Sequence, residues 1–64
     1  MEERKLAWTP AELAAEATRR GRPISAERIR QLCKTGEIPA RKHGTVWMIL
    51  DSAAHRWLER WLNK

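Results

Sequence analysis

Residues 24–34, "ISAERIRQLCK", carry several hydrogen-bonding and cationic side chains in a segment with helical periodicity. At about 100° per residue, its apolar residues gather on one side of a helix and its polar residues spread over the other. These polar residues are Glu27, Arg28, Arg30, Gln31 and Lys34. An exposed face of this kind can place side chains at base edges in the major groove of duplex DNA. A charged helix face is more often merely solvated, so the choice between a DNA-binding face and a solvated face depends on the neighbouring segments.

Covalent chemistry has few candidate residues in this chain. Cys33 falls on the predicted apolar side of the helix, while His43 and His55 lie on other elements, with no acidic pair or glycine-rich phosphate loop beside them. We expect an inert core thiol at Cys33 and a surface residue at His55, although an unusually low thiol pKa would favour a nucleophile. We therefore expect no enzyme, no cofactor and no metal site, because a single cysteine leaves no second sulfur ligand for zinc.

Length and charge narrow the class of protein. A 64-residue chain forms one domain and buries only about 60% of its unfolded surface, so a large internal active-site cavity is not expected. The 13 Lys and Arg against 8 Asp and Glu give a net charge of +5, which favours a polyanionic partner, nucleic acid first. Without a disulfide, a long apolar run or a signal-like N-terminus, the sequence predicts a soluble, cytoplasmic protein with no membrane association.

The segment "TPAEL" carries the start signals of a first helix. Thr9 can cap, Pro10 suits the first helical position, and Glu12 can complete a capping box. The predicted helix runs from Pro10 to about residue 19 or 20, and Gly21 ends it. Its inner face is expected to comprise Leu13, Ala14 and Ala17.

The second helix repeats this pattern. Ser25 is the expected cap and Gly36 lies just past the expected end. The buried side is expected to comprise Ala26, Ile29, Leu32 and Cys33. Two short helices joined by a break, the second with a free polar face, are what a helix-turn-helix requires.

The segment "IPARKHGTVWMI" predicts a basic hairpin after the second helix. Its His43-Gly44 pair suits a tight turn before the strand-like residues 46–49. If Trp47 and Ile49 point inward, the hairpin presents four polar side chains at its tip and sides: Arg41, Lys42, His43 and Thr45. Such a wing is well placed to touch phosphates.

A last helix is predicted from about Asp51 or Ser52. One apolar arc contains Ala54, Trp57, Leu58, Trp61 and Leu62. The opposite side is mixed in charge rather than basic, which favours a core helix over a membrane-surface helix. The four tryptophans are expected to supply most of the core volume. The predicted fold class is mostly α with a small β-hairpin, a single winged helix-turn-helix domain over residues 1–64, with residues 1–7 a flexible N-terminus.

From about Leu6 to Leu62 the chain resembles the excisionase-like, MerR-related winged helix-turn-helix domains of phage and bacterial DNA-binding proteins. The most specific part is the second helix running into "TGEIPA" and a basic wing that ends in Trp-x-Ile. The resemblance implies that residues 25–35 enter the major groove and that residues 42–45 lie against the neighbouring backbone or minor groove. The implied DNA-binding residues are Ser25, Arg28, Arg30, Gln31, Lys34, Arg41, Lys42, His43 and Thr45.

The stretch "ATRRGRPIS" departs from the family, whose typical members make a turn several residues shorter. The extra residues lengthen the first helix by a turn or form a basic loop. In the second case Arg19, Arg20 and Arg22 either add phosphate contacts or are simply solvated, and the sequence favours neither alternative.

Within the resembled family, the small stand-alone members are recombination directionality factors, which bind DNA, often side by side, bend it and steer an integrase toward excision. The short chain favours this role. A transcriptional regulator of the same fold is the alternative. The candidates for contacts between copies are Val46, Met48 and the end of the last helix, which are alternatively ordinary partly buried positions. A protein-interaction module that binds an acidic partner is the competing class. RNA is less favoured because the sequence predicts no exposed aromatic platform.

Overall fold

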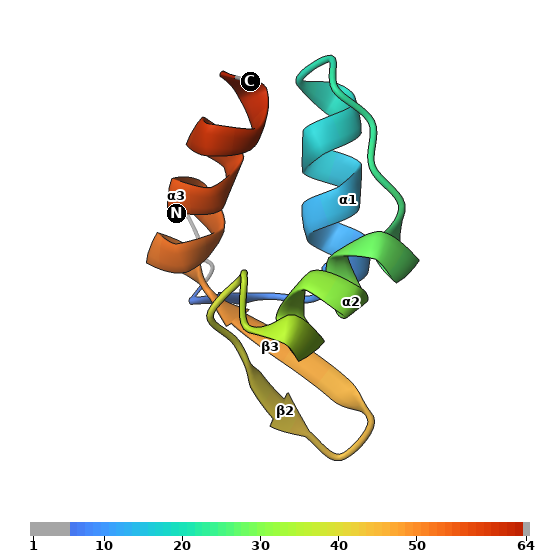
Figure 1. Cartoon of the computed structure of the whole chain (residues 1–64), viewed down its shortest axis with the longest axis vertical. Helices are drawn as coiled ribbons and strands as arrows, with labels where there is room; N and C mark the ends of the chain where they lie inside the picture. Colours follow the sequence, from blue (N-terminus) through green and yellow to red (C-terminus); the bar gives the residue numbers. More distant parts are fainter. Residues whose placement is uncertain (1–5, 64) are drawn as a thin grey trace, which may run out of the picture.

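The computed structural model describes residues 6–63 of the chain. Along the sequence the elements are β1 (Ala7–Trp8), α1 (Pro10–Arg19), α2 (Ala26–Thr35), β2 (Arg41–His43), β3 (Val46–Leu50) and α3 (Asp51–Leu62). Figure 1 shows α1 and α3 on one side of the small sheet, with α2 beside the base of α1 and the β2–β3 hairpin projecting away from the helices. The predicted order of helix, helix, hairpin and helix is confirmed, and it is compatible with a winged helix-turn-helix arrangement.

Helix α1 begins and ends through the local signals found in the sequence. The Thr9 hydroxyl accepts from the Glu12 N–H at 3.2 Å, and the Glu12 carboxylate accepts from the Thr9 N–H at 3.0 Å, which completes the capping box. At the other end Gly21 has a φ of 101°. The amides of Gly21 and Arg22 donate to carbonyls of the last turn at 3.1 and 3.0 Å, a Schellman motif. The extra residues before α2 therefore do not lengthen the first helix.

Helix α2 is held at both ends in the same way. The Ser25 hydroxyl accepts from the Arg28 N–H at 3.1 Å, and Gly36 takes a left-handed φ of 90° after the last turn. Ile38 then turns back, and its N–H donates to the Leu32 carbonyl at 3.2 Å. The Ile38 side chain is fully buried, so this connection anchors the start of the hairpin to α2.

The sheet is antiparallel, in the order β1-β3-β2. The turn of the hairpin comprises Gly44 and Thr45, because His43 pairs with Val46 in the ladder. The prediction of a His43-Gly44 turn was therefore displaced by one residue. A two-residue turn with positive φ only at its first central position needs glycine there, and Gly44 supplies a φ of 61°.

Strand β1 was not predicted. Its register pairs Ala7 with Leu50 and Trp8 with Ile49. The first amide of α3 also donates to the Leu6 carbonyl at 3.0 Å, which extends the connection. The expectation that residues 1–7 are a flexible N-terminus is thus wrong at Ala7, and residues 1–5 lie outside the described residues. Two residues carry too little pattern to predict a strand, since it is the partner strand that orders them.

Aliphatic side chains occupy the centre of the core. The largest fully buried side chains are Leu13, Ile29, Ile38, Ile49 and Leu58. Trp57 is buried beside them, whereas the other three tryptophans are only partly buried at the margin. The expectation that tryptophan supplies most of the core volume was therefore wrong. An indole is too large for complete enclosure in so thin a core, and its N–H needs a partner. Trp8 donates to Asp51 at 2.8 Å and Trp61 to the Arg22 carbonyl at 3.0 Å.

Candidate nucleic-acid interface

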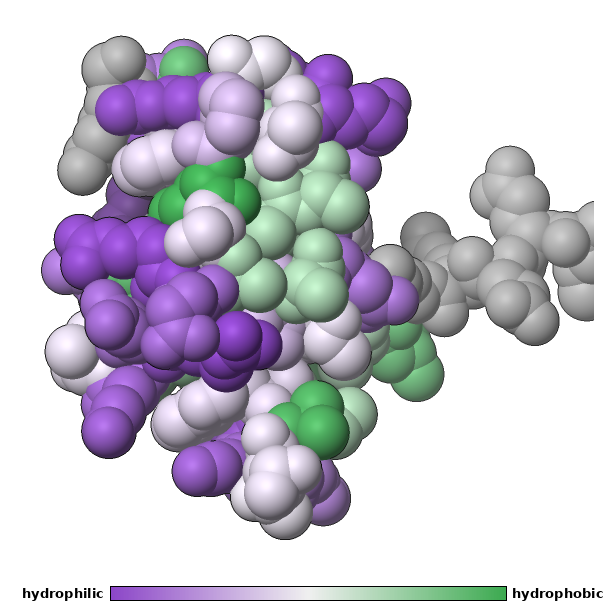
Figure 2. Space-filling view, turned by 90° about the vertical axis from the view of Figure 1, so that its right-hand side faces the viewer, coloured by the Kyte–Doolittle hydropathy of each residue, from purple (hydrophilic) through white to green (hydrophobic). Residues whose placement is uncertain are grey.

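The exposed side of α2 forms the centre of the candidate site. Its apolar side is buried, mainly against α1, through Ile29, Leu32 and Cys33. The four α2 residues predicted to contact DNA are all exposed: Arg28, Arg30, Gln31 and Lys34. In Figure 2, which faces the side carrying α2 and the hairpin tip, hydrophilic side chains gather over the left-hand part at the height of α2. Packing of one side therefore leaves the other free for a ligand.

These four residues do not point in one direction. At 3.6 residues per turn, Arg28 and Arg30 lie about 160° apart around the helix, with Gln31 between them on the solvent side. Lys34 lies on the same flank as Arg30, one turn later. The side of α2 is thus broad enough for its two flanks to contact the two walls of a groove.

A carboxylate holds Arg30 in the free protein. Its guanidinium lies 3.0 Å from Glu27 Oε1, and the two side chains are 47% and 71% exposed. An exposed pair of this kind contributes only about 0.3–0.5 kcal/mol, because water screens both charges. Arg30 can therefore exchange Glu27 for a base edge at little cost. On the other flank, Arg28 Nη1 lies 3.5 Å from Gln31 Oε1, a weaker contact.

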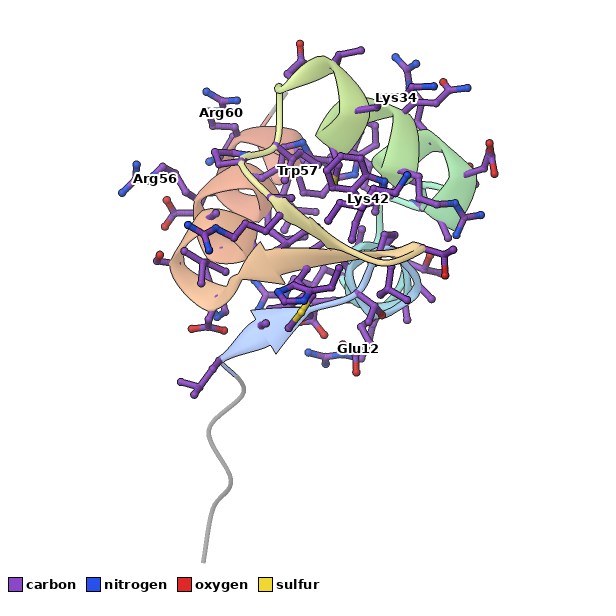
Figure 3. All side chains as sticks on the ribbon, turned by 90° about the horizontal axis from the view of Figure 1, so that it is seen from below. Glu12, Lys34, Lys42, Arg56, Trp57 and Arg60 are labelled. Atoms are coloured by element: carbon purple, nitrogen blue, oxygen red, sulfur yellow. The ribbon has the colours of Figure 1, made fainter. Side chains whose placement is uncertain are left out.

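The hairpin divides its basic residues between two faces. Residues directly opposite in an antiparallel pair share a face, so Arg41 and His43 lie with Met48 and Val46, whereas Lys42 lies with Trp47 on the other face. The Lys42 ammonium is 5.7 Å from the centre of the Trp47 ring. Figure 3 shows Lys42 on the same side of the molecule as Lys34 of α2.

The sequence grouped all the basic hairpin residues as one wing, but the structure brings only part of that set toward α2. Lys42 shares the side of α2, and Thr45 is exposed in the turn at the tip. Arg41 and His43 face away from the inner side of the sheet. Ser25 is exposed at the N-terminus of α2, where its hydroxyl oxygen caps the helix and its O–H remains a donor.

Arg60 is a candidate that sequence reasoning missed. It lines a small depression of about 90 Å³ between α2 and α3, together with Arg28 and Glu37. The remaining lining residues are Ile24, Leu32, Trp57 and Trp61. The available signal was its spacing, because Arg60 follows Trp57 by three residues and must border the apolar arc of the last helix. Arg28 and Arg60 thus bring positive charge from two elements to one place.

The three arginines of the long connection are already engaged. Glu16 accepts from Arg19 at 2.7 Å and from Arg20 at 2.6 Å. The hydrogen bond from Arg19, then that from Arg20, lowers the pKa of the Glu16 carboxyl below its usual value. The carboxylate therefore offsets positive charge at this end of α1.

Arg22 ties the connection to α3 in a reciprocal arrangement. Its Nη1 donates to the Trp61 carbonyl at 2.5 Å, while the Trp61 indole N–H donates to the Arg22 carbonyl at 3.0 Å. The guanidinium carbon lies 4.1 Å above the centre of the Trp61 ring. The connection is therefore a structural link between α1, α2 and α3, and its arginines are weaker candidates for phosphate contacts than those of α2.

The groups considered for covalent chemistry are not assembled into a site. Cys33 is buried, and burial raises the pKa of its thiol. His55 lies on α3, with Nε2 3.2 Å from Asp51 Oδ1 and its ring edge-on to Trp8. Over residues 6–63 there is no group of three or more His, Cys, Asp and Glu residues able to hold a metal ion. Cys33 thus lacks the environment of an activated thiolate.

Alkylation of Cys33 tests this environment. The thiolate is the reactive form, and a raised pKa lowers its fraction at every pH below that pKa. We expect iodoacetamide at neutral pH to react at least about tenfold more slowly with the folded chain than with the same chain in urea, and the rate to rise with pH. Mass spectrometry of quenched samples measures both rates. Equal rates in the folded and unfolded chains would contradict the buried, protonated thiol.

Comparison of the chain with protein-family models, with curated proteins and with solved structures finds no match. Among the helices of residues 6–63, none combines the length and the apolar character that crossing a membrane requires. The functional assignment therefore rests on the geometry of α2 and the hairpin.

Proposed function

We propose that this chain is a sequence-specific double-stranded DNA-binding protein that places α2 in the major groove and the tip of the hairpin against the adjacent backbone. The observation that carries the proposal is α2 itself, which is capped at both ends, packed through one side and exposed through an Arg, Gln and Lys side. The net charge of +5 and the position of Lys42 of the hairpin on the same side as Lys34 of α2 support it.

The dimensions and chemistry of α2 suit this role. The major groove is about 12 Å wide and admits one helix of about 10–12 Å diameter. Arginine can donate two hydrogen bonds to the edge of guanine, and glutamine can pair with the edge of adenine. We assign base contacts to Arg30 and Gln31, which lie on the solvent side of α2. Lys34, Lys42 and Thr45 fit phosphate contacts, which fix position without reading sequence.

Within this class we propose the architectural role of an excisionase-like factor in site-specific recombination, with an integrase as partner. The resemblance over residues 6–62 covers both such factors and transcriptional regulators of the same fold. The two roles differ in what happens to the DNA. We expect fluorophores at the two ends of a bound duplex to approach one another, as in a bent complex, whereas an unbent site favours the regulator.

Fluorescence anisotropy across a salt series tests the proposal. We expect random duplex DNA to bind more tightly than single-stranded DNA or duplex RNA, with an affinity that falls steeply as salt rises. Selection from a randomised duplex library then identifies the preferred site. Weak binding to all three nucleic acids would contradict the proposal and favour the module that binds an acidic protein.

Replacing Lys42 by alanine tests the hairpin. We expect binding to all duplexes to weaken alike, and the slope of log K against log salt to fall in magnitude by about one, because one phosphate contact is lost. Arg56→Ala serves as the control, because it removes an exposed cation from α3, and the slope is expected to stay unchanged. An unchanged slope in Lys42→Ala would remove the hairpin from the interface.

A further inference from the structure

The face of the sheet that points away from the core, here called the outer sheet face, carries apolar side chains. Alternation along β3 places Val46, Met48 and Leu50 on it, and these residues are 46%, 39% and 66% exposed. The solvated face of an antiparallel sheet is normally polar. Three exposed apolar residues on one strand therefore call for a function, and the proposed DNA interface on α2 does not use them.

The outer sheet face is hollowed rather than flat. A groove of about 520 Å³ crosses it, within the range of about 300–1,000 Å³ found for ligand sites. Its lining comes from all three strands and from the segment before β2: Ala7, Pro39, Ala40, Arg41, His43, Met48 and Leu50. A concave site of this size fits a short segment better than the broad, flat surface of a globular partner.

The charge of the groove specifies the chemistry of its occupant. Arg41 and His43 are its only ionisable lining residues, and no carboxylate of the described residues lines it. The guanidinium of Arg41 makes no hydrogen bond or ion pair with any of residues 6–63, in contrast to Arg19, Arg20, Arg22 and Arg30. A free cation beside exposed Met48 and Leu50 complements a carboxylate adjacent to apolar side chains.

We propose that the groove of the outer sheet face binds a short segment of a partner protein in which Asp or Glu residues stand next to apolar residues. DNA fits it less well, because a phosphate backbone offers no apolar surface to Met48 and Leu50. A second copy of the chain also fits poorly, because two copies of this groove would bring two Arg41 guanidinium groups to the interface and no carboxylate from the described lining residues. This surface is separate from α2, so the inference goes beyond the proposed DNA-binding function.

A peptide selection tests the inference on the full chain. A phage-displayed library of random 12-residue peptides is selected on the immobilised protein, and the enriched peptides are synthesised. We expect them to combine Asp or Glu with apolar residues. In NMR titrations they are expected to shift the signals of Met48, Leu50 and Arg41 and to leave those of Arg30 and Lys34 unchanged.

Two variants of the groove sharpen the test. Arg41→Glu is expected to weaken binding of the selected peptides at least tenfold. It is expected to strengthen binding of peptide variants in which Lys replaces each Asp or Glu. Met48→Thr keeps a strand-forming residue and is expected to weaken the acidic peptides at least fivefold while duplex DNA affinity stays within twofold. Arg56→Glu, a charge change on α3 outside the groove, controls for net charge and is expected to leave peptide affinity unchanged.

The inference is overturned if the selection enriches no peptides or peptides without carboxylates, or if the peptides bind Arg41→Glu as tightly as the unmodified chain. It is also overturned if the chain forms a concentration-dependent dimer that Met48→Thr dissociates. A third contrary result is that duplex DNA shifts the NMR signals of Met48 and Leu50. The peptide experiments do not measure the affinity of α2 for duplex DNA. Loss of the docking surface and loss of DNA binding are therefore distinguishable outcomes.

Discussion

Replacing Arg30 by alanine is expected to weaken binding to the preferred duplex by about 1–3 kcal/mol, or about 5- to 150-fold, and to weaken random duplex less. Arg30 is exposed on α2, and its only described partner, Glu27, is itself 71% exposed. A base-edge contact contributes to the preferred sequence alone, whereas a phosphate contact contributes to every duplex. Anisotropy titrations with the selected site and with a scrambled duplex of equal length measure the two losses.

Two companion variants support the assignment of Arg30. Arg56→Ala removes an exposed arginine from α3 and controls for the change in net charge. Glu27→Gln frees Arg30 and removes a carboxylate from the proposed interface, so we expect duplex affinity to rise. Equal losses on both duplexes in Arg30→Ala would identify a phosphate contact, and no loss would place the recognition surface elsewhere on the molecule.

Replacing Ile38 by alanine is expected to lower the free energy of unfolding by about 2–5 kcal/mol. Ile38 is fully buried where α2 turns back toward the hairpin, so truncation removes apolar contacts and leaves a cavity. Natural domains have about 0.05–0.15 kcal/mol of stability per residue, so a loss of this size is a large part of the total for 64 residues. Urea denaturation followed by tryptophan fluorescence measures it.

Met48→Ala is the matched control for this stability prediction. Met48 lies nearby in the sequence but on the outer sheet face, and it is partly exposed. Its truncation is expected to change the free energy of unfolding by no more than about 1 kcal/mol, since 39% of Met48 is exposed to water in the folded chain and its removal leaves no closed cavity. If Ile38→Ala costs no more than Met48→Ala, then Ile38 does not anchor the connection between α2 and the hairpin.

The sequence by itself determined the helices and their free side. Thr9 and Glu12 cap α1, and Ser25 and Gly36 bound α2, through hydrogen bonds and dihedral angles among residues at most a few positions apart. The periodicity of α2 likewise predicted which side is buried and which is exposed. The hairpin was predicted with its turn displaced by one residue, because His43 and Gly44 both suit a turn and only the pairing partner Val46 decides between them.

Only the tertiary structure decided how these pieces combine. β1 exists because β3 orders Ala7 and Trp8, and Trp8 bonds to a residue 43 positions away. Arg22 is not a free cation, because it forms reciprocal hydrogen bonds with Trp61, 39 positions away. The division of the hairpin between the side of α2 and the outer sheet face follows from which face of β3 meets the core. Local hydrogen bonds act between neighbours and can be found in a short window of sequence, whereas these contacts depend on partners that only the packed chain brings together.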